Sequence, residues 1–149
     1  MGVFVVNTST AIALQGQSFS AVLEAVDQRL LQWQTSPDAW DQLLQKVFGR
    51  SASVDLSSIV IELLDAATMV GLHGAYAPIT PDGDERIYLN AEWLNSASAT
   101  EVEAVLLEEL GHALDWRING SNDTAGDEGA IFSALIRSVW GWPPDWALP

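Results

Sequence analysis

The feature that most constrains the fold is one capped and mainly apolar helix in the second half of the chain. Two overlapping capping boxes, Ser98-x-x-Glu101 and Thr100-x-x-Glu103, predict a helix over about residues 99–117. Most positions along it are apolar, so it must be buried against other elements. The apolar positions are Val102, Val105, Leu106, Leu110, Ala113 and Leu114.

Three ionisable groups interrupt this apolar pattern. Glu108 and His112 are four residues apart and project from one helix face, with Glu109 on its flank. Adjacent carboxylates beside a buried apolar run are costly unless a cation neutralises them. Gly111 lies between them, and its missing side chain would let another element approach closely. The alternative interpretation is a solvated acidic face with one incidental histidine.

The stretch Glu-Glu-Leu-Gly-His-Ala-Leu-Asp at 108–115 resembles the zinc-protease helix H-E-x-x-H-A-[LI]-D, with glutamate in place of the first histidine. The resemblance implies that Glu108 and His112 are metal ligands and that Glu109 is the catalytic base acting through a metal-bound water. The order strand, helix, loop, helix resembles the zincin metallopeptidase core, including its thermolysin-like and lethal-factor-like branches. It implies a third ligand on the next helix, Glu128, with Asp127 as the alternative.

A wider resemblance covers roughly residues 58–138. This region, with Gly-Ala-Tyr-Ala at 74–77 and Ile-Tyr-Leu-Asn-Ala at 87–91, is similar to a module of large cyanobacterial secreted proteins that often carry haemolysin-type calcium-binding repeats. The resemblance implies a secreted or extracellular setting, neighbouring domains of a larger protein as partners, and a peptide or protein substrate. A cytoplasmic location remains an alternative.

The glutamate at position 108 also bears on the metal. A carboxylate is a harder and more negative ligand than imidazole, so Zn²⁺ is expected first, with Mn²⁺, Fe²⁺ or Ca²⁺ as alternatives. The added negative charge would make a bound water less acidic, which weakens the Lewis-acid effect. A catalytically inactive, zincin-derived binding or structural module is therefore the alternative to a peptidase.

Several other residues are candidates for the site. Asp115, three residues after His112, would orient its imidazole or be a surface charge at the helix end. His73 would be an outer ligand or a substrate contact, or a loop histidine satisfied by the backbone. Tyr88 and Tyr76 would stabilise an oxyanion or pack in the core. A second oxygen cluster would bind Ca²⁺ or supply alternative ligands; it comprises Asn122, Asp123, Asp127 and Glu128.

The remaining patterns predict one α+β domain, residues 1–149, with a small mixed sheet on the active-site helix. Residues 1–50 would be a helical N-terminal part, with helices over about 18–34 and from Pro37 to a stop at Gly49, and residues 58–138 the metallopeptidase-like core. Short strands are expected at 3–6, 58–64 and 86–91, a short helix within 65–72, and another helix from about Asp127. An all-α interaction domain is the third alternative, and it requires that residues 59–64 and 87–91 do not pair.

The composition excludes several functions. The net charge of −14 argues against nucleic acid and anionic membranes as partners. Because the chain has no cysteine, any metal must be held by His, Asp, Glu, backbone or water. No stretch is long enough to cross a bilayer, and the N-terminus lacks the basic region of a signal peptide.

Overall fold

The protein is a mixed α+β structure. The computed structural model describes residues 4–6, 13–14, 17–51, 56, 58–81, 83–120 and 128–137, and for residues 4–6, 13–14, 17–18 and Glu128 it describes the backbone alone. The oxygen cluster residues Asn122, Asp123 and Asp127 lie outside these ranges.

The sheet has four strands in the order β1-β4-β6-β5. They are β1 (Phe4–Val6), β4 (Ile59–Leu64), β5 (Gly74–Ala77) and β6 (Arg86–Asn90). The first three strands in this order are parallel, and β5 joins β6 antiparallel at the edge. Because Ile61 pairs with Ile87 and Leu63 with Leu89, the all-α alternative is wrong. A separate two-stranded hairpin joins β2 (Ala13–Leu14) and β3 (Gln17–Ser18).

The two N-terminal helices form where the apolar periodicity predicts them. They are α1 (Phe19–Gln34) and α2 (Pro37–Phe48). Pro37 occupies the first turn, and Gly49 ends α2 in the left-handed region with φ 87°. Ser36 stands at the N-cap position, although its side chain makes no capping hydrogen bond.

The sequence patterns were less accurate around the short elements. The helix expected within 65–72 is only α3 (Ala66–Met69), capped by Asp65, whose side chain accepts a hydrogen bond from the amide of Thr68. Residue 91 does not end a strand; it starts the short helix α4 (Ala91–Leu94), because the Asn90 side chain caps the amide of Trp93. Strand β5 was not expected as a strand at all.

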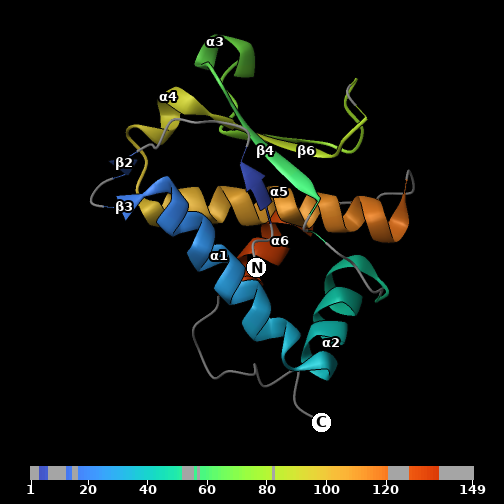
Figure 1. Ribbon diagram of the computed structural model, residues 1–149. Helices are drawn as coiled ribbons and strands as arrows, with labels where there is room; N and C mark the ends of the chain where they lie inside the picture. The colour runs from blue at the N-terminus through green and yellow to red at the C-terminus, as the bar shows by residue number, and fades with distance from the viewer. Residues whose placement is uncertain are drawn as a thin grey trace.

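The long helix α5 (Ala99–Asn119) lies between the sheet and the layer that contains α1 and α2, as Figure 1 shows. Its capping box is confirmed, with Ser98 and Glu101 satisfying each other's backbone amides. Helix α6 (Glu128–Ile136) crosses α5 on the side away from the sheet, and α1 and α2 complete that layer. The core between these layers is apolar; its fully buried members include Leu30, Leu43, Ile61, Ile87, Leu89, Leu106, Leu110 and Phe132.

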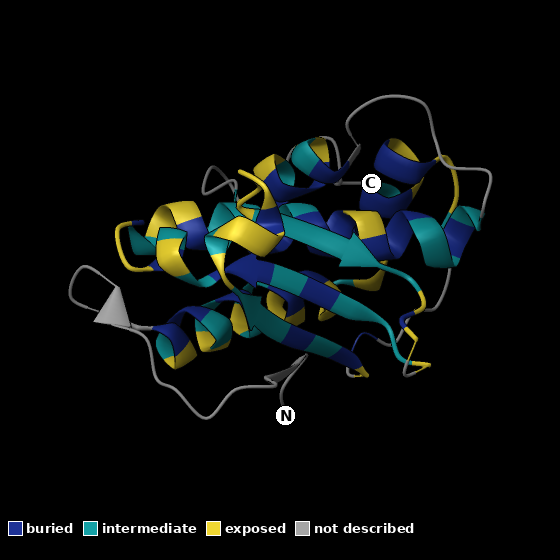
Figure 2. Ribbon diagram, turned by 90° about the horizontal axis from the view of Figure 1, so that it is seen from above, coloured by how far each residue is buried: buried dark blue, intermediate teal, exposed yellow. Residues whose placement is uncertain are grey.

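Seen from the sheet side, the first residues of β4 and β6 alternate between buried and partly exposed positions (Figure 2). Ile87 and Leu89 of β6 point into the core, whereas Arg86 and Tyr88 belong to the opposite face. Arg86 forms ion pairs there with Glu62 and Asp84. Among the described residues, no helix combines the length and apolarity that a bilayer crossing requires.

Candidate metal centre

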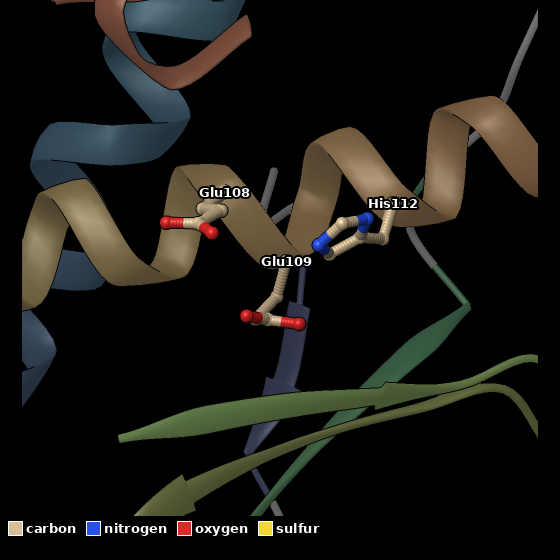
Figure 3. A group of neighbouring side chains, drawn as sticks. All are labelled: Glu108, Glu109 and His112. Atoms are coloured by element: carbon tan, nitrogen blue, oxygen red, sulfur yellow. The ribbon is translucent and has the colours of Figure 1, made fainter. Parts of the chain in front are cut away.

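Three side chains of α5 converge at one point, as the helix spacing predicts. Glu108, Glu109 and His112 each offer one potential ligand atom, and these atoms lie within 4.8 Å of one another. Figure 3 shows Glu109 pointing from α5 toward the strands, with Glu108 and His112 on either side. Glu109 is buried with 8% of its surface exposed, Glu108 is partly exposed, and His112 is open to solvent. The group is therefore reachable from outside on one side only.

These side chains line two adjoining cavities between α5 and β5. The larger has a volume of about 570 Å³ and runs toward Asp115, Trp116 and Pro78. The smaller has about 320 Å³ and extends toward His73 and Val105. Leu72, Gly74, Glu108 and Glu109 line both cavities, so the two form one groove along the edge of the sheet.

The groove depends on a glycine in β5. A methyl group on Gly74 would lie 2.9 Å from Cγ1 of Val105 and 3.2 Å from Cγ of Glu109. The missing side chain therefore lets the strand approach α5 at the position of the buried carboxylate. The sequence analysis assigned Gly74 no such function, because only the pairing of β5 with β6 places it beside α5.

The close approach of another element at the glycine inside the motif is confirmed. A methyl group on Gly111 would lie 2.7 Å from Cα of Gly129, so the close neighbour is α6 and not a strand. Gly129 in turn lies against the centre: its methyl would be 2.7 Å from the carbonyl oxygen of Glu108 and 3.1 Å from Nε2 of His112. The backbone at the start of α6 is thus beside the histidine. Glu128 is the first residue of that helix, and its side chain, like Asp127 and Asp123, lies outside the described part of the structure.

Asp115 lies one turn beyond His112 on the wall of the larger cavity. It is buried with 6% exposure, and its Oδ1 accepts a hydrogen bond of 2.8 Å from Nδ2 of Asn119. The same amide donates to the carbonyl oxygen of Phe48, which ties this end of α5 to the end of α2. The carboxylate is therefore not the surface charge of the alternative interpretation, and its orientation is fixed from the C-terminal side.

His73 lies at the other end of the groove. Its ring stacks on Trp93, with centroids 4.3 Å apart and planes at 8°, and it lines the smaller cavity. It does not belong to the group of converging ligand atoms, which comprises the α5 side chains alone among the described residues. This position fits a contact to a bound molecule better than a metal ligand.

The two tyrosines occupy opposite faces of the sheet. Tyr88 pairs with Glu62 and Ala75 on the face away from α5, so it does not line the groove. The role of Tyr88 in stabilising an oxyanion stays a prediction. Tyr76 does line the larger cavity, but its hydroxyl donates a hydrogen bond to Glu85. Glu85 and its second partner, Arg117, were not found from the sequence.

Comparison with protein-family models, curated proteins and solved structures gave no match for this chain. The function must therefore be argued from the geometry of this centre and from the motif that produces it.

Proposed function

We propose that this chain is a zincin-like, metal-dependent peptidase domain that hydrolyses peptide bonds in the groove between β5 and α5. The observation that carries the proposal is the convergence of Glu108, Glu109 and His112 beside an open sheet edge. One buried carboxylate, one partly exposed carboxylate and one exposed imidazole are a suitable set for a cation and a general base.

The residues present fit a divalent cation. Two carboxylates within 4.8 Å of each other repel unless a positive charge lies between them, and His112 adds a neutral nitrogen ligand. Glu108 and His112 would hold the cation. The close approach of Gly129 to His112 supports Glu128 as the third ligand. Zn²⁺ suits this mixed donor set best, while Mn²⁺ and Fe²⁺ also accept it.

Such a cation would act as a Lewis acid toward a water molecule and the peptide carbonyl. Glu109 would take the proton from the attacking water and deliver it to the leaving amine. Glu109 is buried next to Gly74, between the cation-binding side chains and the edge of the sheet. The outer edge of β5, which pairs with no further strand among the described residues, would hold an extended peptide by main-chain hydrogen bonds, so that its carbonyl lies over the α5 side chains.

A second candidate function follows from the position of Glu109. Because its ligand atom also lies within 4.8 Å of those of Glu108 and His112, Glu109 could itself be a third ligand. The site would then be closed, without a general base, and the domain would be a non-catalytic metal-binding module. We also propose, from the resemblance of residues 58–138, that either function belongs to a secreted protein.

Metal content and one substitution test these alternatives. The chelator-treated protein should take up about one equivalent of Zn²⁺, Mn²⁺ or Fe²⁺ per chain, measured by elemental mass spectrometry, and His112→Ala should abolish the uptake. Glu109→Gln should retain the metal and lower the rate of peptide hydrolysis about 100-fold or more. The matched control is Glu24→Gln on the exposed side of α1, which should change neither.

The outcomes separate the two functions. Loss of metal in Glu109→Gln would favour the closed site of the non-catalytic module. Failure of the unaltered protein to bind any of the three metals would overturn both.

A further inference from the structure

A hydrogen-bonded network joins the two sides of the groove. The Tyr76 hydroxyl on β5 donates to Oε2 of Glu85, the residue before β6. Arg117 on α5 donates from Nε to Oε1 of the same carboxylate at 3.0 Å, and its Nη2 reaches both Oε1 and, at 3.2 Å, Oγ of Ser58. Glu85 is largely buried, with 11% of its side chain exposed. One carboxylate thus joins both sides of the groove through charge-assisted hydrogen bonds, which are stronger than neutral ones.

The network keeps the hydroxyl of Tyr76 protonated. Burial raises the pKa of its phenol, and the hydrogen bond and negative charge of Glu85 raise it further, so the hydroxyl stays protonated and remains a donor. The hydroxyl is directed to Glu85, while the tyrosine lines the larger cavity and packs against the core. Arg117, which would otherwise attract acidic groups, is paired with Glu85.

The far end of the groove is consequently lined by large carbon surfaces. Tyr76 and Pro78 come from the β5 side and Trp116 from α5. The ionisable groups that line the same cavity are the carboxylates of Glu108, Glu109 and Asp115 and the imidazole of His112. An acidic side chain would be repelled here, whereas a large apolar side chain would contact the rings and displace water.

We propose that Glu85 is a specificity-determining positioning residue. By holding Tyr76 and Arg117, it shapes the end of the groove next to Trp116 to accept a bulky aliphatic or aromatic side chain of an extended peptide. The inference rests on the proposed function for the peptide nature of the ligand. It adds the class of peptide that the groove selects.

The test measures peptide preference independently of hydrolysis. The full chain carrying Glu109→Gln, loaded with Zn²⁺, is used to select binders from a random peptide library. Enriched peptides should carry a large apolar residue at one fixed position, at least about tenfold above acidic and small residues, as apolar pockets discriminate. Tyr76→Phe, which deletes only the hydroxyl, and Glu85→Gln should each reduce this enrichment to about twofold without changing Zn²⁺ uptake.

The controls separate positioning from folding. Tyr76→Phe keeps the ion pair of Glu85 with Arg117, so it remains informative if Glu85→Gln does not fold. Glu24→Gln, on the exposed side of α1, should leave the preference for apolar residues unchanged. Absence of an apolar preference in the starting protein, or its persistence in a folded Tyr76→Phe, would overturn the inference.

The two proposals fail separately. A preference for apolar residues in a protein that hydrolyses no peptide would overturn the peptidase and leave the inference standing. Hydrolysis of peptides without a preference for apolar residues would support the peptidase and overturn the inference.

Discussion

Burial distinguishes the two adjacent glutamates of the motif. Glu109 is under the edge of the sheet, close to Gly74, whereas Glu108 is partly exposed next to the start of α6. The two glutamates are therefore suited to different tasks. The buried carboxylate of Glu109 is suited to proton transfer, and the accessible carboxylate of Glu108 is suited to binding a cation. At Glu108 the chain departs from the histidine of the zinc-protease motif, so this position is where metal preference is most directly testable.

Replacing Glu108 with histidine should raise the affinity for Zn²⁺. The substitution removes one negative charge and supplies a neutral imidazole nitrogen one turn from His112, a pair that Zn²⁺ favours over Ca²⁺. We expect Zn²⁺ affinity to increase about tenfold, on the order of 1.4 kcal/mol, and Ca²⁺ affinity to fall, as measured by competitive chelator titration. Glu24→His is the control for a histidine added elsewhere. Unchanged Zn²⁺ affinity would mean that residue 108 is not a ligand.

Close contacts at three glycines bring a strand and a helix against α5 at the candidate metal centre. Gly74 brings β5 against α5, and Gly111 with Gly129 brings α6 against its other side. A methyl group added at any of these glycines would lie less than 3.0 Å from a neighbouring atom. Room for it would require β5 or α6 to move away from α5, which would open the site. Chain segments that are far apart in sequence are thereby held around three side chains of α5.

A methyl group at the α5–α6 contact should disturb both stability and metal binding. Alanine has the higher helix propensity by about 1 kcal/mol, so Gly129→Ala would stabilise α6 if there were room. The methyl would instead meet the Glu108 carbonyl at 2.7 Å and Nε2 of His112 at 3.1 Å. We expect a net loss of about 1–3 kcal/mol in unfolding free energy, measured in urea, together with weaker Zn²⁺ binding.

The control for this prediction is Ala134→Ser on the exposed side of α6. It should be close to neutral in both measurements. An increase in stability for Gly129→Ala would show that the two helices are not in tight contact at this point.

Elements with their own repeating signal were predictable from the sequence, and those defined by distant partners were not. Helices α1 and α2 carry an apolar stripe, and α5 also carries its own cap, so local residues specify them. All four residues of β5 are half-buried, and the strand shows no alternation that would distinguish it from a loop. Its place follows only from pairing with β6.

The same distinction applies to the site. Glu108, Glu109 and His112 are visible because helix geometry relates them directly. The contact of Glu85 with Arg117 spans 32 residues, so no sequence pattern reveals it. The third ligand proposed on α6 is of the same long-range kind, and the sequence suggested it only through the resemblance to zincins.

The whole molecule is strongly acidic, and several of its carboxylates stabilise local structure in their ionised form. The backbone amide of Ser98, the largest cause, lowers the pKa of Glu101 in the capping box. The hydrogen bond from Arg86 lowers the pKa of Asp84, and that from Thr68 lowers the pKa of Asp65 at the start of α3. All three carboxyls are more acidic in the folded chain than in the unfolded chain.

Folding stability should therefore decline in acid. A carboxyl with a lowered folded-state pKa contributes stability that is fully present above its unfolded value, about 3.9 for Asp and 4.3 for Glu, and is lost as pH falls through the folded value. Urea unfolding at pH values from 7 to 3 should show a midpoint that holds near neutrality and decreases below about pH 4. The fall occurs even though acid also reduces the repulsion within a chain of net charge −14.

Glu101→Gln isolates one part of this dependence. The neutral amide cannot ionise, so the variant should be less stable than the unaltered protein at pH 7 and should approach it as pH falls toward 3. The matched control is Glu24→Gln, on the exposed side of α1, which should follow the unaltered protein at every pH. A constant difference between Glu101→Gln and the unaltered protein over the whole range would show that the capping box does not depend on charge. The start of α5, and with it the position of the candidate metal centre, would then be set by packing alone.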